Sequence, residues 1–179
     1  MNRNYFAPQF EKFKTRHPYQ PGAKLTRFNR VIINPEYLGF ICARCRAFVS
    51  AEPITSGVKN RNHCPYCLWS IHVDLFEVGD RLAACKESME PIGLTVKKTR
   101  KKYGDVQQGE LMIIHCCVDC GKISINRIAA DDDPEKIYHL FARTVEFEPA
   151  LKVKLENDGI FVLTAANKDV VCARLFGRT

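Results

Sequence analysis

Two Cys-x-x-Cys pairs constrain this chain more than any other feature of its sequence. Cys42 and Cys45 form the first pair, and Cys64 and Cys67 follow after eighteen intervening residues. Two residues between cysteines allow a tight turn to aim both sulfurs at one ion, and two such turns complete a tetrahedron around zinc. The spacing therefore predicts a four-cysteine zinc ribbon.

A second set of cysteines lies further along the chain. Cys85 stands alone and is followed by the pair Cys117 and Cys120. Three thiolates leave one position of a tetrahedral zinc site to be filled. The candidates for the fourth donor are His63, His72, His115 and Cys116.

An internal comparison ranks these candidates. Phe40 stands two residues before Cys42, and His115 stands two residues before Cys117. His115 thus corresponds to an aromatic packing residue, and Cys116 points to the face of its strand opposite Cys117. We expect His72 to be the fourth ligand, with His115 as the alternative.

The redox compartment follows from the number of cysteines. Nine cysteines in a chain whose first residues form no apolar leader argue against a framework of disulfides. No run approaches the ~18 apolar residues of a membrane span. We expect a cytoplasmic protein, not attached to a membrane, that binds two zinc ions.

The net charge of +7 is concentrated in residues 1–35. Pro, Gly and six aromatic residues interrupt every helix or strand period there, which predicts an extended arm. The arm has Glu11 as its one acidic residue, so its net charge is +6. Its basic residues are Arg3, Lys12, Lys14, Arg16, Lys24, Arg27 and Arg30.

Residues 36–133 predict a small β-rich α+β core in which two zinc-ribbon-like units combine. Short apolar runs lie beside the cysteine pairs, at 37–41, 68–75, 92–96, 111–114 and 123–128. A basic segment between the third and fourth runs predicts a basic hairpin tip. It contains Lys97, Lys98, Arg100, Lys101 and Lys102.

Residues 134–179 predict a small α+β appendage. Asp133 and Pro134 are typical of a helix N-terminus, and the helix should end near Arg143. The apolar segments at 151–156 and 160–164, joined by the turn 157–159, predict a β-hairpin, with a further strand at 170–176. Cys172 is expected to be a buried small residue.

Residues 36–133 resemble the RNHCP-domain family. The resemblance rests on Arg61–Asp74, Gly79-Asp80-Arg81, Cys85, Met89–Ile92 and Asn126–Asp132 in that order. It implies a zinc-ribbon-like domain and implies no established activity. The polar residues of these motifs have two possible roles, internal pairing around the zinc ligands or an exposed face that reads RNA.

Three functions are compatible with these features. We favour a non-catalytic zinc protein that binds RNA, with ribosomal RNA and ribosomal proteins as the expected partners, because a basic arm with aromatic rings can neutralise phosphates and stack on bases. One alternative is a zinc hydrolase or nuclease, with His72, Asp74 or Asp80 as acid–base partner. The other is a DNA-binding zinc ribbon.

Overall fold

The computed structural model describes residues 39–77, 79–97 and 109–177. The basic arm and most of the basic segment at 97–102 lie outside these residues. The helices and strands are β1 (Gly39–Ile41), β2 (Phe48–Ser50), α1 (Pro53–Ser56), β3 (Ser70–Ile71), β4 (Ser88–Lys97), β5 (Glu110–Cys117), β6 (Ile123–Arg127), α2 (Pro134–Val145), α3 (Pro149–Asn157), the 3₁₀ helix η3 (Ala165–Asn167) and α4 (Lys168–Phe176).

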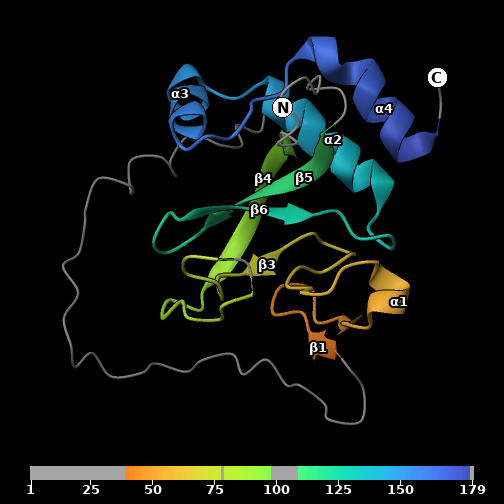
Figure 1. Cartoon of the computed structure of the whole chain (residues 1–179), viewed down its shortest axis with the longest axis vertical. Helices are drawn as coiled ribbons and strands as arrows, with labels where there is room; N and C mark the ends of the chain where they lie inside the picture. The colour runs from red at the N-terminus through yellow and green to blue at the C-terminus, as the bar shows by residue number, and fades with distance from the viewer. Residues whose placement is uncertain (1–38, 78, 98–108, 178–179) are drawn as a thin grey trace, which may run out of the picture.

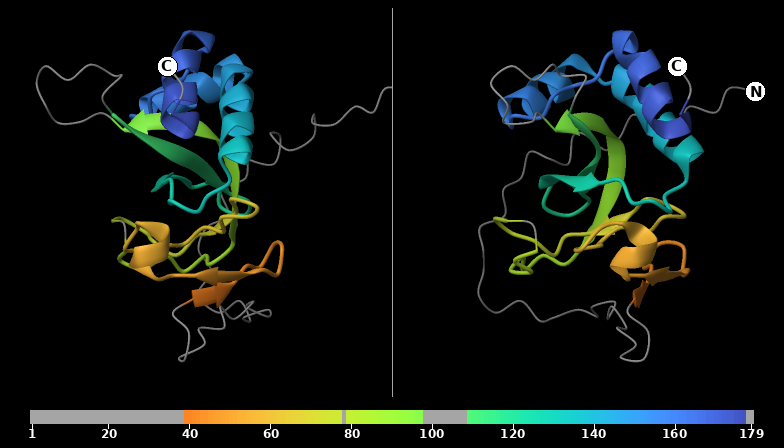
Figure 2. Two further views of the ribbon diagram at one scale, coloured as in Figure 1. Left: turned by 90° about the vertical axis from the view of Figure 1, so that its right-hand side faces the viewer. Right: turned by 45° about the vertical axis from the view of Figure 1, so that its right-hand side comes forward.

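The strands form two antiparallel sheets. β1 and β2 make a two-stranded sheet, and the larger sheet has the order β3-β4-β5-β6. Helices α2, α3 and α4 gather at one end of the larger sheet, and β1, α1 and the loops around β3 gather at the other (Figure 1). Figure 2 shows the same division from two further directions.

The long β4–β5 hairpin connects the two ends of the molecule. Its register pairs Met89 with Cys117 at one end and Lys97 with Glu110 at the other. Eight residue steps at ~3.3 Å each separate these ends by roughly 26 Å. The predicted basic tip therefore begins at the end of the hairpin farthest from the cysteine ligands.

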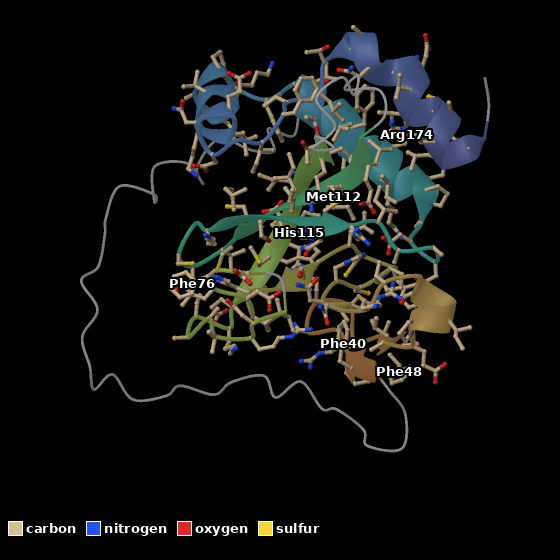
Figure 3. All side chains as sticks on the ribbon, viewed as in Figure 1. Phe40, Phe48, Phe76, Met112, His115 and Arg174 are labelled. Carbon is tan, nitrogen blue, oxygen red and sulfur yellow. The ribbon has the colours of Figure 1, made fainter. Side chains whose placement is uncertain are left out.

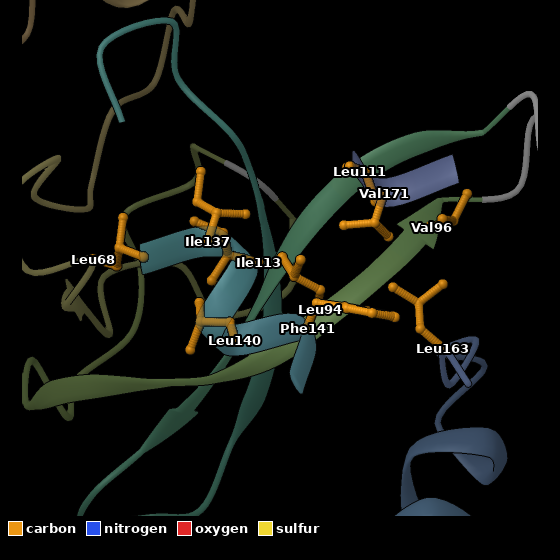
Figure 4. Close-up of a cluster of buried hydrophobic side chains, with 10 residues drawn as sticks. All are labelled: Leu68, Leu94, Val96, Leu111, Ile113, Ile137, Leu140, Phe141, Leu163 and Val171. Carbon is orange, nitrogen blue, oxygen red and sulfur yellow. The ribbon is translucent and has the colours of Figure 1, made fainter. Parts of the chain in front are cut away.

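The main hydrophobic core joins the sheet to the C-terminal helices (Figure 4). Strands β4 and β5 supply one side of it, and α2 and α4 supply the other. A further residue, Leu68, comes from the second cysteine pair. The buried members are Leu68, Leu94, Val96, Leu111, Ile113, Ile137, Leu140, Phe141, Leu163 and Val171.

A close contact fixes α2 against β4. The Leu94 amide donates to the Thr144 hydroxyl at 2.7 Å, and that hydroxyl donates to the Leu140 carbonyl at 2.7 Å. Gly93 permits this approach, because a Cβ atom there would lie 2.6 Å from the Thr144 hydroxyl oxygen. The helix is thus held by a buried hydrogen bond as well as by apolar packing.

The five predicted strand regions of the core each contain a strand, at β1, β3, β4, β5 and β6. The predicted start of α2 is also confirmed, since the Asp133 side chain accepts hydrogen bonds from the amides of Glu135 and Lys136. Strand β2 and helix α1 were not predicted. Each spans four residues or fewer, too short for a hydrophobic period to register.

The predicted β-hairpin and third strand at 151–176 are wrong, because these residues form α3, η3 and α4. Leu151, Val153 and Leu155 alternate as in a strand. In the helix, however, Leu155 is buried and Leu151 packs beside it, while Val153 is exposed. The helical spacing of four residues prevails over the alternation of two.

The C-terminal residues also belong to the core. Ile137, Leu140 and Phe141 from α2 and Val171 from α4 lie in the same cluster as Leu94 and Ile113. The region therefore covers one end of the sheet and is not an appendage beside it. The domain boundaries at residues 35 and 133 stay predictions. Within the described residues, no helix has the length and apolar character needed to cross a membrane.

Candidate metal centres

The three Cys-x-x-Cys pairs adopt one turn. In each, the amide of the first cysteine bonds at 2.9 Å to the carbonyl of the residue five positions later, and that cysteine's own carbonyl accepts from the amide four positions later. Such a turn brings two thiols to the same side of the backbone. The first cysteines are Cys42, Cys64 and Cys117.

The turn requires a left-handed residue at its fourth step. Arg46, Leu68 and Gly121 occupy this position with φ of 64°, 61° and 69°. Only glycine adopts this conformation without strain. Leu68 is held there by burial of its side chain in the main core, so tertiary packing supports the geometry of the second pair.

The first candidate centre consists of Cys42, Cys45, Cys64 and Cys67, whose sulfurs all lie within 4.8 Å of one another. The sulfur of Cys42 lies 3.6 Å from that of Cys67, and the sulfur of Cys45 lies 3.5 Å from that of Cys64. A zinc tetrahedron with bonds of ~2.3 Å has edges of about 3.8 Å. These separations fit that edge and exceed the ~2.05 Å of a disulfide.

The thiol pKa values in the first centre show why these four cysteines would bind a cation. The Cys67 thiol donates a hydrogen bond toward Cys64, which lowers the pKa of Cys64 to about 5. The same interaction, with burial, raises the pKa of Cys67 far above its usual value. Ionisation of Cys64 thus opposes ionisation of Cys67, and a divalent cation would relieve that opposition.

The second candidate centre consists of His72, Cys85, Cys117 and Cys120, again with ligand atoms within 4.8 Å of one another. The sulfur of Cys85 lies 3.6 Å from that of Cys117, and the sulfur of Cys120 lies 3.3 Å from Nδ1 of His72. Burial raises the pKa of Cys85 and Cys117. Burial also lowers the pKa of His72, which favours the neutral imidazole that binds metals.

The first centre is built from two Cys-x-x-Cys turns, whereas the second has one such turn and takes its other two ligands from His72 and Cys85. The His72 amide donates to the Glu87 carbonyl at 2.8 Å, which extends the β3–β4 pairing and brings together His72, just after β3, and Cys85, shortly before β4. Between them, Asp80 accepts hydrogen bonds from four backbone amides of residues 75–82, and Asp74 accepts from Gly79 and Arg81. These hydrogen bonds lower the pKa of Asp80, and the bond from the Glu77 amide has the largest effect.

His115 lies outside both sets of ligand atoms. Its Nε2 donates to the Leu68 carbonyl at 2.7 Å, and its Nδ1 accepts from the Asn126 amide at 2.9 Å. Burial lowers the pKa of His115 to about 3, so the ring is neutral. With both nitrogens engaged in hydrogen bonds, His115 has none left to offer an ion.

A buried charged network lies beside the first centre. Arg61 contacts Asp131 at 2.8 Å and Asp132 at 3.4 Å, while His63 Nε2 contacts Asp132 at 2.8 Å. The Asp132 carboxylate also accepts the Ala129 amide at 2.7 Å. Arg61, His63 and Asp132 are buried, so the structure gives these polar residues the internal-pairing role and not that of an exposed reading face.

The segment Arg61-Asn62-His63-Cys64-Pro65 contains residues of both this network and the first centre. It lies within the region that matches a protein family. The model of the RNHCP domain matches residues 38–138, more than half of the chain. The chain belongs to the RNHCP-domain family. The curated proteins contain no match to it, and neither do the solved structures.

The RNHCP domain of this chain has two candidate zinc sites. One site has four cysteines, and the other has three cysteines and a histidine. All nine cysteines lie in the described residues, and none of them forms a disulfide. Both donor sets are compatible with zinc, which favours sulfur and imidazole nitrogen in tetrahedral sites. The match extends five residues beyond the predicted boundary, to Tyr138 on α2.

The predicted RNA-binding residues fall largely outside the described part of the RNHCP protein. Lys97 is described and is exposed at the end of β4. The remaining predicted contacts, in the arm and at 98–102, lie outside the described residues. Sequence reasoning missed one surface feature, a contact of 4.7 Å between the Arg44 guanidinium and the ring of Trp69, although both residues adjoin the cysteine pairs.

Proposed function

We propose that this protein is a non-catalytic RNA-binding protein of the ribosome, in which two zinc sites hold a rigid body and basic segments contact RNA. The observation that carries the proposal is the uneven charge. Residues 1–35 have a net charge of +6, while residues 36–133 have thirteen basic and thirteen acidic side chains. Thiolates around zinc make the body still more negative, because four of them exceed the charge of one ion.

The body would place its basic segments far apart. The arm precedes Gly39 in β1, and the segment after Lys97 leaves the opposite end of the molecule, where α4 packs (Figure 1). Arg174 of α4 bonds to the Gly109 carbonyl and so braces the base of that segment. A partner that met both would have to be extended, as a structured RNA is.

The arrangement of the second centre supports a structural role over catalysis. His72 supplies a fourth donor atom beside the three cysteines. The carboxylates of Asp74 and Asp80, the proposed acid–base partners of a zinc hydrolase, accept backbone amides of their own loop. A fully coordinated site leaves no position for a reactive water.

Sedimentation with ribosomes at moderate salt tests the proposal. The full chain should sediment with them, and deletion of residues 1–35 should release it and reduce the salt dependence of binding, because fewer counterions are displaced. Zinc content should not change, since the ligands follow the deletion. Replacing Phe6, Phe10 and Phe13 with Ala should weaken binding with little change in salt slope.

A second comparison separates the nucleic acids. Structured RNA, single-stranded RNA and duplex DNA should be titrated at matched salt, since affinities at different salt cannot be compared. Preference for structured RNA supports the proposal. Equal or tighter binding of duplex DNA would favour the DNA-binding ribbon, and a chain that bound none of them would refute the proposal.

A further inference from the structure

The first zinc ribbon has exposed groups able to stack on bases. We propose that Arg44, Tyr66 and Trp69 form a docking surface for unpaired RNA bases that continues the basic arm. The inference rests on the proposed function and names the part of the body that would complete its RNA contact.

The positions between the cysteines carry the argument. In each Cys-x-x-Cys turn the residue before the second cysteine is exposed, and it is Arg44 in the first turn, Tyr66 in the second and Asp119 in the third. Tyr66 keeps 58% of its surface exposed although it lies between two zinc ligands. The first centre thus displays a cation and an aromatic ring, and the second displays a carboxylate.

The Arg44 guanidinium lies over an aromatic ring. It lies 4.7 Å from the centre of the Trp69 ring, which follows the second cysteine pair. The Arg44 residue as a whole is exposed. The planar guanidinium is a group on which an RNA base can stack, and its charge attracts phosphate.

The charge around these side chains favours RNA as the partner. Residues 39–51 contain Arg44 and Arg46 and no acidic residue. Residues 58–73 likewise contain Lys59 and Arg61 and no acidic residue, although Arg61 is paired with Asp131 and Asp132. Glu52, between these two segments, is exposed, and four thiolates around zinc are net negative, so the positive charge is a local one of the exposed side chains Arg44, Arg46 and Lys59. These three cations beside the rings suit phosphate groups.

The first ribbon has a further exposed ring at the first described residue of the chain. Phe48 on β2 is 44% exposed, and its ring lies against Gly39, so close that a Cβ atom at Gly39 would meet it at 2.5 Å. Figure 3 shows Phe48 beside β1, the first strand of the described residues. Because Gly39 directly follows residues 1–38 in the chain, the first ribbon is the part of the described body that adjoins the arm in sequence.

Trp69 provides a direct test, because it is the single tryptophan of the chain. Its fluorescence should change and saturate when the full-length protein is titrated with a ten-nucleotide oligouridylate. Arg44→Lys, which keeps the charge, and Tyr66→Ala should each weaken binding about tenfold with an unchanged salt slope, as expected for the loss of one stacking contact. Tyr66→Phe should bind as the parent does.

Phe76→Ala is the matched control. Phe76 is an aromatic residue with 82% of its surface exposed, but it lies on the Asp80 loop beside the second centre. Its replacement should leave affinity unchanged. None of these variants removes a zinc ligand, so zinc content by metal analysis should remain that of the parent and would expose a variant that had misfolded.

The outcomes separate this inference from the function on which it rests. If deletion of residues 1–35 abolishes binding while Arg44→Lys and Tyr66→Ala both bind as the parent does, the docking surface is refuted and the proposed function stands. If the full chain binds neither ribosomes nor the oligonucleotide, both fail. Tighter binding of an oligodeoxythymidylate of equal length would refute RNA as the ligand of this surface.

Discussion

His115 Nε2 donates a hydrogen bond of 2.7 Å to the carbonyl oxygen of Leu68, across 47 residues of sequence. Leu68 follows the second cysteine pair of the first centre, and His115 precedes the cysteine pair of the second. The bond therefore ties the two metal centres together through β5. Leu68 adds its side chain to the main core, so this one residue joins a zinc turn, a buried imidazole and the packed helices.

His115→Phe should reduce stability without loss of zinc. Phenylalanine fills similar space, as Phe40 does in the first ribbon. It cannot hydrogen-bond to the Leu68 carbonyl or to the side-chain amide of Asn126, so both groups lose this partner. We expect a loss of about 1–3 kcal/mol in the free energy of unfolding, measured by urea denaturation. A fall in zinc content from two ions to one would show instead that His115 is a ligand.

The burial of His115 predicts that the free energy of unfolding depends on pH. Burial lowers the pKa of His115 to about 3, whereas an unfolded histidine titrates near ~6.5. Its contribution to stability is complete above pH ~6.5 and is lost as the pH falls toward 3, by up to ~1.4 kcal/mol per unit. The stability difference between the parent and His115→Phe should therefore shrink from pH 7 to pH 5, and a constant difference would contradict the assignment.

Asp132→Asn should be strongly destabilising. The Asp132 carboxylate is buried against Arg61 and His63, and the substitution leaves Asp131 as the one carboxylate in contact with the Arg61 guanidinium among the described residues. Removing one partner of a buried ion pair typically costs ~3–5 kcal/mol. Asp131→Asn is the control, because 32% of the Asp131 side chain is exposed and its loss should cost less. Equal losses in thermal denaturation would count against the network.

His72→Ala should lower the zinc content of the purified protein from two ions toward one. Removing a direct ligand should cost at least the ~100-fold in metal affinity that loss of an outer partner can cost. His72→Cys should restore two ions, because a thiolate replaces the imidazole and no ring nitrogen is left buried. In the parent, His72 Nε2 is buried without a hydrogen-bond partner among the described residues. Full zinc retention by His72→Ala would exclude His72 as a ligand.

Cys64→Ser should remove the first zinc ion and disturb the main core. Its turn positions Leu68, whose side chain packs among the core residues, and a structural zinc site supplies folding free energy that a small domain cannot easily replace. Cys172→Ser is the matched control, since Cys172 lies on α4 outside both metal centres. A Cys64→Ser protein with the parent's melting temperature would contradict a structural role.

Local sequence rules accounted for the beginnings of several elements. Asp133 and Pro134 marked the start of α2 because a helix cap depends on atoms within one turn. At residues 151–156 such rules failed. An alternating pattern and a helical pattern share Leu151 and Leu155, and only the core packing of Leu155 separates them.

The sequence by itself determined the zinc turns and the membership of this family. A Cys-x-x-Cys turn is closed by bonds within six residues, so its spacing alone fixes two ligands. Only the tertiary structure decided what completes and surrounds each set. His72 meets Cys120 across 48 residues, and Arg61 meets Asp131 across 70, because the sheet and its packing bring these segments together. Such distant pairings depend on the whole core, which no local pattern encodes.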